Sequence, residues 1–260
     1  AWYHKALAPD LLKKDLLEQW RTKKILILAI IFLFVAISSP IMAKILPELM
    51  KSISVPGMVI SLPAPTYLDA IDQYIKNISQ IAILVVIFII AGAICDEKNR
   101  KTLEIILTKP ISRMIFVLSK FKSYFISIIS VFVVCSIIFY IYTASIFGLF
   151  NLVNFIIVNA LVLLYILMIA SITILASTIV KNSIIAGGIG FFSYIIFGTI
   201  FGLVESIKPY SPGKIFDIYE SVIKTGWTND LVWPLIITIV VIITSAISAI
   251  IIFRKQEIDR

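Results

Sequence analysis

Residues 123–180 read SYFISIISVFVVCSIIFYIYTASIFGLFNLVNFIIVNALVLLYILMIASITILASTIV and contain no charged side chain. A membrane-spanning helix needs about 20 mostly apolar residues, so this stretch is too long to be one helix. Gly148 to Asn151 is the natural break within it, because glycine and asparagine favour turns. The stretch therefore predicts two consecutive membrane-spanning helices, at about 123–147 and 152–180.

The composition of the whole chain is that of a membrane protein. Of its 260 residues, 60% are hydrophobic and 15% are charged, and the mean hydropathy is +1.04. Soluble domains carry about 25% charged residues. The composition therefore excludes an ordinary soluble enzyme, a disordered protein and a disulfide scaffold. Cys95 and Cys135 both lie in apolar runs, where cysteine behaves as a small hydrophobic residue. His4 is the only histidine, so we expect no metal site.

Four further apolar stretches qualify, or nearly qualify, as membrane spans. These runs do not alternate between apolar and polar residues, as the strands of a membrane β-barrel would. We therefore predict an all-α integral membrane protein with six transmembrane helices. The other four spans are predicted at about 25–46, 78–95, 183–204 and 231–253.

The distribution of lysine and arginine predicts the orientation. The connections on one side of the membrane carry 17 of these residues, and those on the other side carry six. Basic residues gather on the cytoplasmic side, so we expect both termini to be cytoplasmic (N-in/C-in). The predicted order is a cytoplasmic arm, one transmembrane domain and a cytoplasmic tail, at 1–24, 25–253 and 254–260. The connections are predicted to be cytoplasmic at 96–122 and external at 47–77 and 205–230.

An amphipathic helix is expected just before the first span, within residues 10–24. Leu12, Leu16 and Trp20 recur at a spacing of four, and a basic helix with such a face tends to lie in the membrane interface. A cytoplasmic helix that packs on a partner is the alternative. Pro9 suits the first turn of this helix.

The external connections contain both irregular and helical stretches. From Thr66 onward the apolar residues follow helical spacing, which predicts a short helix leading into the second span. Asp69 and Asp72 form a D-x-x-D pair, a motif that holds magnesium in some membrane enzymes, but without a second acidic motif a solvated helix face is favoured. The connection at 205–230 is expected to form short helices in the outer leaflet or a lid, with Ser211 accessible from outside.

Several functional classes are disfavoured by what the spans lack. The sequence holds no G-x-x-x-x-G-K-[ST] phosphate-binding loop. No Asp, Glu, Lys or Arg stands in the middle of a span, where a proton relay needs such residues. The polar residues in the spans are expected to form interhelical hydrogen bonds, with a polar pathway as the alternative. They are Asn159, Tyr165, Ser171, Thr173, Ser193, Tyr194, Thr238, Thr244 and Ser245.

The fifth predicted span is rich in glycine. Small residues spaced by four allow two helices to approach closely. We expect Gly187, Gly190, Gly198 and Gly202 to pack against other helices, either within one subunit or between two.

The connection at 96–113, DEKNRKTLEIILTKPISR, has an order that a merely basic loop does not need. Leu103, Ile106 and Leu107 lie on one face of a helix that starts near Thr102, and Pro110 ends it. Such a short helix, joined directly to two spans, can transmit a push from a soluble partner into the membrane domain.

This segment resembles that of the ABC-2 type permeases, the membrane subunits of ATP-binding-cassette exporters. The resemblance extends to the interfacial helix, the six spans and the partly apolar segment before the last span, although Lys101 stands where the family often has glycine. The residues that match the family pattern are Glu97, Arg100, Thr102, Leu103, Glu104, Leu107, Pro110, Ser112 and Arg113.

The resemblance implies that this segment is a coupling helix seated in a groove of a separate ATPase subunit. It also implies that two permeases and two ATPases form one transporter. ATP and Mg²⁺ would then bind to the ATPase, and this chain would bind no cofactor and catalyse no reaction itself. We further predict a homodimer in the cell membrane, with the first, second and fifth spans lining a central pathway. The expected partners are the ATPase, the second permease and membrane lipid, and no nucleic acid.

Two other classes of function are open to a chain of this kind. One is a non-transporting polytopic membrane protein, such as an assembly factor or an intramembrane enzyme. The other is a passive channel or an ion-coupled carrier, which would transport without ATP in reconstituted vesicles.

Overall fold

A computed structural model of the protein describes residues 2–53, 64–99 and 112–256. Within these ranges the secondary structure is helical, without strands. This confirms the prediction of an all-α membrane protein with six transmembrane helices. The helices long and apolar enough to cross a membrane are Lys24–Pro47, Tyr67–Asn99, Arg113–Phe147, Leu152–Ile179, Ser183–Leu203 and Asn229–Lys255.

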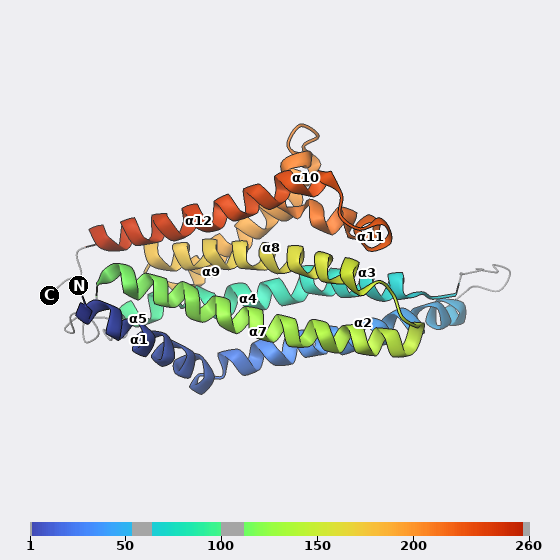
Figure 1. Ribbon diagram of the computed structural model, residues 1–260, viewed down its shortest axis with the longest axis horizontal. Coiled ribbons are helices and arrows are strands. Elements are labelled where there is room, and N and C mark those ends of the chain that lie inside the picture. The colour runs from blue at the N-terminus through green and yellow to red at the C-terminus, as the bar shows by residue number, and fades with distance from the viewer. Residues whose placement is uncertain (1, 54–63, 100–111, 257–260) are drawn as a thin grey trace.

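The chain begins with a helix that bends sharply into the first span. Helix α1 (Trp2–Arg21) precedes α2 (Lys24–Ile53), and Figure 1 shows the bend between them. Lys23 makes this bend with a φ of 61°, in the left-handed region. Pro9 lies inside α1 rather than in its first turn, so that prediction is wrong. The alanine, lysine and leucine residues before Pro9 favour helix strongly enough to extend it towards the N-terminus.

The second span belongs to a helical column that starts before the predicted span. Helix α3 (Tyr67–Asn77) continues through the π-helical turn η1 (Ile78–Ala82) into α4 (Ile83–Ala91), and α5 (Cys95–Asn99) follows. The predicted helix from Thr66 onward is therefore present.

The two acids of the D-x-x-D pair both serve helix α3. Asp69 accepts a hydrogen bond from the backbone N–H of Thr66 at 2.7 Å, which caps the start of the helix. Asp72 pairs with Lys76, with 2.6 Å between Oδ2 and Nζ. Capping by a carboxylate satisfies donors that the first helical turn leaves unpaired.

Residues 123–180 form two helices separated by a turn, as their length requires. These are α7 (Arg113–Phe147) and α8 (Leu152–Ile179). Gly148 makes the turn with a φ of 90°, and the Asn151 side chain caps α8 by accepting from the N–H of Val153 at 3.0 Å. Helix α7 begins before residue 123 and is about 52 Å long, so it extends well beyond a hydrocarbon core of about 30 Å.

Glycine lets the fifth span approach its neighbours closely. This span consists of α9 (Ser183–Ile195), the π-helical turn η2 (Ile196–Ile200) and α10 (Phe201–Leu203). A Cβ atom at Gly190 would overlap the Thr173 hydroxyl and lie 3.0 Å from Ile87, and one at Gly187 would lie 3.4 Å from Ala91. Helix α9 therefore packs against α4 and α8 through its small residues.

The other two glycines of this span differ from each other. A Cβ atom at Gly198 would lie 2.8 Å from the Tyr165 hydroxyl. At Gly202, no described side chain or neighbouring backbone atom comes within 4 Å of that position. The close packing predicted for Gly202 is therefore not found within the described chain, because here the span has left its contact with α8.

The last connection before the sixth span forms four short helices. They are η3 (Lys208–Tyr210), η4 (Pro212–Lys214), α11 (Ile215–Thr225) and η5 (Asn229–Leu231). Ser211 is 1% exposed and donates its hydroxyl to the Phe197 carbonyl at 3.0 Å. The expected accessibility of Ser211 is wrong, because the turn at Pro212 folds it against η2. The Tyr219 hydroxyl donates to Asp72, which links α11 to α3.

The sixth span is α12 (Val232–Lys255), which packs against α7 and α8. The most buried spans are the α3–α5 column and α8. In α3, the Tyr74 ring stacks on Phe139 of α7 with centroids 4.0 Å apart. The Tyr74 hydroxyl donates to the Asn159 carbonyl oxygen at 3.1 Å, and Ser136 lies 3.0 Å from the same hydroxyl.

The expectation of interhelical hydrogen bonds holds for only some of the polar residues. Asn159 joins three helices, and the Tyr165 hydroxyl donates to the Tyr194 carbonyl at 3.3 Å. Within the described chain the expectation is wrong for five serine and threonine residues, because a short hydroxyl side chain donates to the carbonyl three or four residues earlier in its own helix. These are Ser171, Thr173, Ser193, Thr238 and Thr244.

Candidate functional site

The first residues of α1 and the last residues of α12 lie at one end of the helical bundle. Figure 1 shows α1, α5, the start of α7 and the end of α12 at that same end. We call it the basic end, because these parts of the chain carry ten lysine and arginine residues. The two described ends of the segment that resembles a coupling helix, α5 and the start of α7, both lie here.

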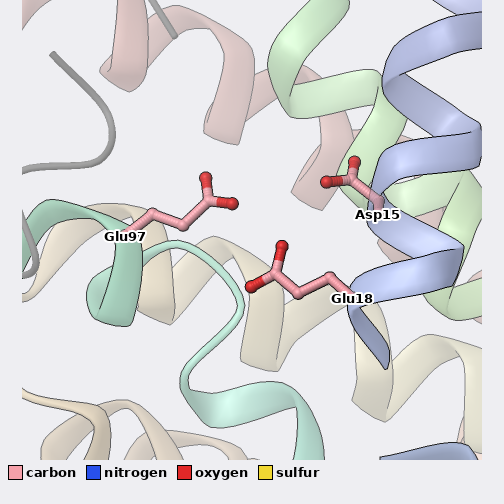
Figure 2. Close-up of side chains that lie close together, drawn as sticks. All are labelled: Asp15, Glu18 and Glu97. Atoms are coloured by element: carbon pink, nitrogen blue, oxygen red, sulfur yellow. The ribbon is translucent and has the colours of Figure 1, made fainter. Parts of the chain in front are cut away.

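A group of charged side chains joins three of these elements. This basic-end charge cluster consists of Lys14, Asp15 and Glu18 on α1, Glu97 on α5 and Lys120 on α7. Figure 2 shows Asp15 and Glu18 reaching from α1 towards Glu97. Asp15, Glu97 and Lys120 are each at most 5% exposed.

Lys120 is the centre of the cluster. Its Nζ lies 2.9 Å from Asp15 Oδ1 and 2.7 Å from Glu97 Oε1. Lys14 Nζ lies 2.9 Å from the same Glu97 oxygen. One buried ammonium thus holds the carboxylates of two different elements. Removing one member of such a buried group is costly, because the remaining charges lose their partner.

The three carboxylates of the cluster stand close enough to hold a cation. One oxygen each of Asp15, Glu18 and Glu97 lies within 4.8 Å of the others. The ammonium of Lys120 lies within 4.0 Å of all three side chains. The cluster thus contains its own positive charge, and its geometry is that of an ion-pair network between helices.

Helix α1 lies on α7 through a row of polar contacts. The Ser119 hydroxyl donates to Asp15 at 2.7 Å. One turn further along both helices, Gln19 donates to Ser123 at 3.1 Å and accepts from Ser127 at 2.7 Å. These hydrogen bonds fix the position of α1 along α7.

The predicted interfacial face of α1 points away from this contact. Leu11, Asp15 and Gln19 form the buried face. Leu12 and Leu16 are half-buried, and Trp20 is 66% exposed. A half-buried leucine stripe ending in an exposed tryptophan suits the membrane–water interface.

Helix α5 is attached to the end of α8. The Ser177 hydroxyl accepts from the backbone N–H of Cys95 at 3.1 Å, and the Cys95 thiol donates to the Ser177 carbonyl at 3.2 Å. Asn99 donates to the Lys181 carbonyl at 2.8 Å. The start of the coupling-like segment is therefore fixed to α8 as well as to the charge cluster.

The other end of the segment is attached to α12. Arg113 is the first residue of α7, and its guanidinium donates to the carbonyls of Arg254 at 2.9 Å and Gln256 at 2.7 Å. The Gln256 side chain in turn donates to the Thr178 carbonyl at 2.9 Å. Arg113 therefore caps the last turn of α12, where helix carbonyls lack partners within the helix.

The described residues of the coupling-like pattern are Glu97, Ser112 and Arg113. Ser112 caps α7 by accepting from the Ile115 N–H at 3.2 Å. All three therefore make contacts within the chain, at the two places where the segment joins the bundle. The remaining predicted coupling residues, Arg100, Thr102, Leu103, Glu104, Leu107 and Pro110, lie outside the described residues.

Asp15 and Gln19 were missed as site residues, because in the sequence of α1 they stand beside charged residues and off the leucine stripe. The signal that points to them lies on α7. Ser119, Ser123 and Ser127 are spaced by four along one face of a long apolar helix. Side chains spaced by four share a helix face, so this row of hydroxyls indicates a polar partner helix.

The fold and this site define a multi-pass membrane protein with a single helical domain and a tethered segment between its second and third spans. The sequence profile of the ABC-2 family transporter proteins matches residues 10–257. The chain therefore belongs to the ABC-2 transporter family, whose members are membrane transport components. It is also 24% identical over 252 residues to YxlG of Bacillus subtilis (strain 168), an uncharacterized transmembrane protein, covering 95% of this chain and 97% of that protein.

Proposed function

We propose that this chain is the permease subunit of an exporter driven by a separate ABC ATPase. The observation that carries the proposal is the attachment of the 96–113 segment at both of its ends. Glu97 joins it to α1 and α7 through Lys120, and Arg113 joins it to α12. A movement imposed on the segment would therefore reach α1, α7 and α12 at once.

In this arrangement the segment, the buried ion pairs and the partner ATPase have different roles. The segment would receive the force of ATP hydrolysis, and the buried ion pairs would pass it on to the bundle. ATP and Mg²⁺ would be held by the partner ATPase. In this proposal Glu97 and Arg113 are the anchors of the coupling helix, and Leu103 and Leu107 supply the apolar face that meets the ATPase.

The orientation belongs to the same proposal. An ABC ATPase works in the cytoplasm, so the basic end would face the cytoplasm and the chain would lie in the cell membrane. A single cysteine at Lys255, in a background lacking Cys95 and Cys135, is expected to resist an impermeant thiol reagent added outside intact cells. A cysteine at the exposed Ser206 is expected to react. If the cysteine at Lys255 were labelled and the one at Ser206 were not, the chain would lie in the membrane in the opposite orientation to the proposed one.

The transport pathway is proposed to form between two copies of the chain. Six spans enclose little space by themselves, and α2, α4 and α9 carry large exposed side chains. Phe88 on α4 is 70% exposed, Phe34 on α2 is 58% exposed and Phe192 on α9 is 65% exposed. These aromatic residues support a homodimer in which the first, second and fifth spans face the second copy.

The experiment that tests the proposal replaces the apolar face of the segment. The chain with Leu103→Ala/Leu107→Ala is purified from its host membrane in mild detergent, and the co-purifying ATPase activity is measured. Loss of interface anchors typically costs more than about 1 kcal/mol each, so ATPase recovery is expected to fall at least tenfold. Glu104→Arg is expected to reduce recovery more than Glu104→Ala, because it adds repulsion.

A matched control uses the same chemistry at the other end of the molecule. Leu149 and Leu203 are 87% and 76% exposed, so Leu149→Ala/Leu203→Ala is expected to leave ATPase recovery unchanged. Full ATPase recovery with Leu103→Ala/Leu107→Ala would refute the coupling assignment. Loss of the variant from the membrane would show instead that the segment is part of the folded core.

A further inference from the structure

An apolar groove runs between α7 and α12 on the surface of the bundle. Its volume is about 440 Å³, within the range of about 300–1,000 Å³ typical of sites for small organic ligands. Phe121, Phe125 and Ile129 form one wall, and Ile243, Ile247 and Ile250 form the other. Among the described residues that line it, Lys122 alone is polar.

The position of the groove along the helices places it in one half of the membrane. About twenty residues cross the hydrocarbon core, so a span that begins at Val232 ends at Ile251. The groove wall Ile242–Ile250 therefore lies in the half of the core that is nearer the basic end. This wall is about 12 Å long, most of the 15 Å that one half of the core measures. At the basic end the two helices close together, where Phe116 stacks on Phe253 with centroids 5.3 Å apart.

The charge near the groove favours an anionic headgroup. Lys122 is exposed and makes no ion pair with any described residue. Arg254 and Lys255 follow the groove wall on α12 and are exposed as well. Long basic side chains at such positions extend to the headgroup layer and attract anionic lipids.

We propose that this groove binds one acyl chain of an anionic phospholipid from the leaflet at the basic end, with Lys122 at the lipid phosphate. The apolar walls fit a hydrocarbon chain, the length fits half the bilayer, and the lysine fits the headgroup. Helix α9 passes behind α8 in Figure 1, whereas α7 and α12 lie in front. The groove therefore stays open to lipid when a second copy covers α9. The inference depends on the membrane-spanning fold and not on ATP-driven export.

The test measures lipid retention by native mass spectrometry. The purified full-length chain is delipidated in detergent and titrated with phosphatidylglycerol or phosphatidylcholine of the same chain length. One tightly retained phosphatidylglycerol is expected, with a preference over phosphatidylcholine of roughly fivefold, the effect of one basic residue near the headgroup. Lys122→Gln is expected to remove this preference while some binding of both lipids remains.

A bulky side chain placed in the groove distinguishes lipid bound there from lipid bound elsewhere on the surface. Ile247→Trp is expected to abolish the retained lipid. Val240→Trp is the matched control, because Val240 is 50% exposed and Ile247 51%, and helical side chains lean towards the N-terminus, here away from the groove. Equal retention by all variants, or no preference for phosphatidylglycerol in the unmodified chain, would overturn the proposal. Disulfide-linked dimers through Ile247→Cys in membranes would also overturn it, since a second copy would then occupy the groove.

Discussion

The guanidinium of Arg113 donates a hydrogen bond to the backbone carbonyl of Arg254 at 2.9 Å, so the first residue of α7 caps the last turn of α12. The two residues are 141 positions apart in the sequence. Together with Lys120, Arg113 makes the start of α7 the meeting point of α1, α5 and α12. Movements at this point are therefore shared among all of them.

Removing this cap is expected to loosen the end of α12. In Arg113→Gln the carbonyls of Arg254 and Gln256 lose a charged donor, an interaction worth about 1.5–3 kcal/mol. Hydrogen–deuterium exchange of the amides in the last turn of α12 is expected to quicken more than tenfold. Arg254→Gln alters an exposed side chain in the same turn and serves as the control. Unchanged exchange in Arg113→Gln would mean that α12 ends without help from α7.

Removing the central ammonium of the charge cluster is expected to destabilise the protein. In Lys120→Met, Asp15 and Glu97 remain buried without their shared cation, at a cost of about 3–5 kcal/mol. The measurement is the midpoint of thermal unfolding in lipid-free detergent. Lys122→Met, two residues along the same helix at an exposed position, is expected to leave the midpoint within error. A Lys120→Met protein as stable as the original would contradict a structural role for the cluster.

Two glycines of α9 are expected to respond oppositely to the same substitution. A methyl group at Gly190 collides with Thr173 and approaches Ile87, so Gly190→Ala is expected to cost about 1–3 kcal/mol of stability. At Gly188 the corresponding space is open among the described residues, and Gly188→Ala is expected to stabilise by up to about 1 kcal/mol through helix propensity. The measurement is the midpoint of thermal unfolding of each variant. Equal midpoints would refute the close contact between Gly190 and Thr173.

The link between α11 and α3 depends on a phenol that stays neutral. Burial, and then the hydrogen bond to Asp72, raise the pKa of Tyr219 above its usual value. A raised pKa in the folded state means that this contribution to stability is fully present below about pH 10, the usual tyrosine value, and is lost as the pH rises through the raised one. Tyr219→Phe is expected to remove about 1 kcal/mol and to speed trypsin cleavage at Lys214 and Lys224.

The control for that variant is Tyr210→Phe. The Tyr210 side chain is 45% exposed and forms no hydrogen bond in the described part of the chain. Removal of the Tyr210 hydroxyl is expected to leave the rate of trypsin cleavage unchanged. The same cleavage rate in both variants would show that the contact between Tyr219 and Asp72 does not hold α11 in place.

The membrane spans could be predicted from the sequence because each depends on its own residues. An uncharged run of known length either spans the bilayer or does not, and Gly148 and Asn151 mark the break between α7 and α8 without reference to any other element. The helix from Thr66 onward is a local feature in the same way. The burial of Ser211 was not predictable locally, since it depends on where η2 lies.

The charge cluster depends on residues far apart in the sequence, which explains why only part of it was found. Asp15 and Ser119 are 104 positions apart. On α1 alone, the leucine stripe is the strong signal, and an acid beside it appears solvated. Glu97 and Arg113 were predicted from a pattern within one segment, but their partners on α7 and α12 become apparent only when the helices are packed.

The chain order of the charge cluster also bears on how the protein is made. Asp15 and Glu97 leave the ribosome before Lys120 does, so both acids are already present when the lysine arrives at the membrane. The charge of Lys120 can therefore be neutralised as soon as α7 inserts, before the last three spans are in the membrane. The ion pairs that join α1, α5 and α7 can therefore form in the nascent chain before α8 emerges, and α12 can dock afterwards.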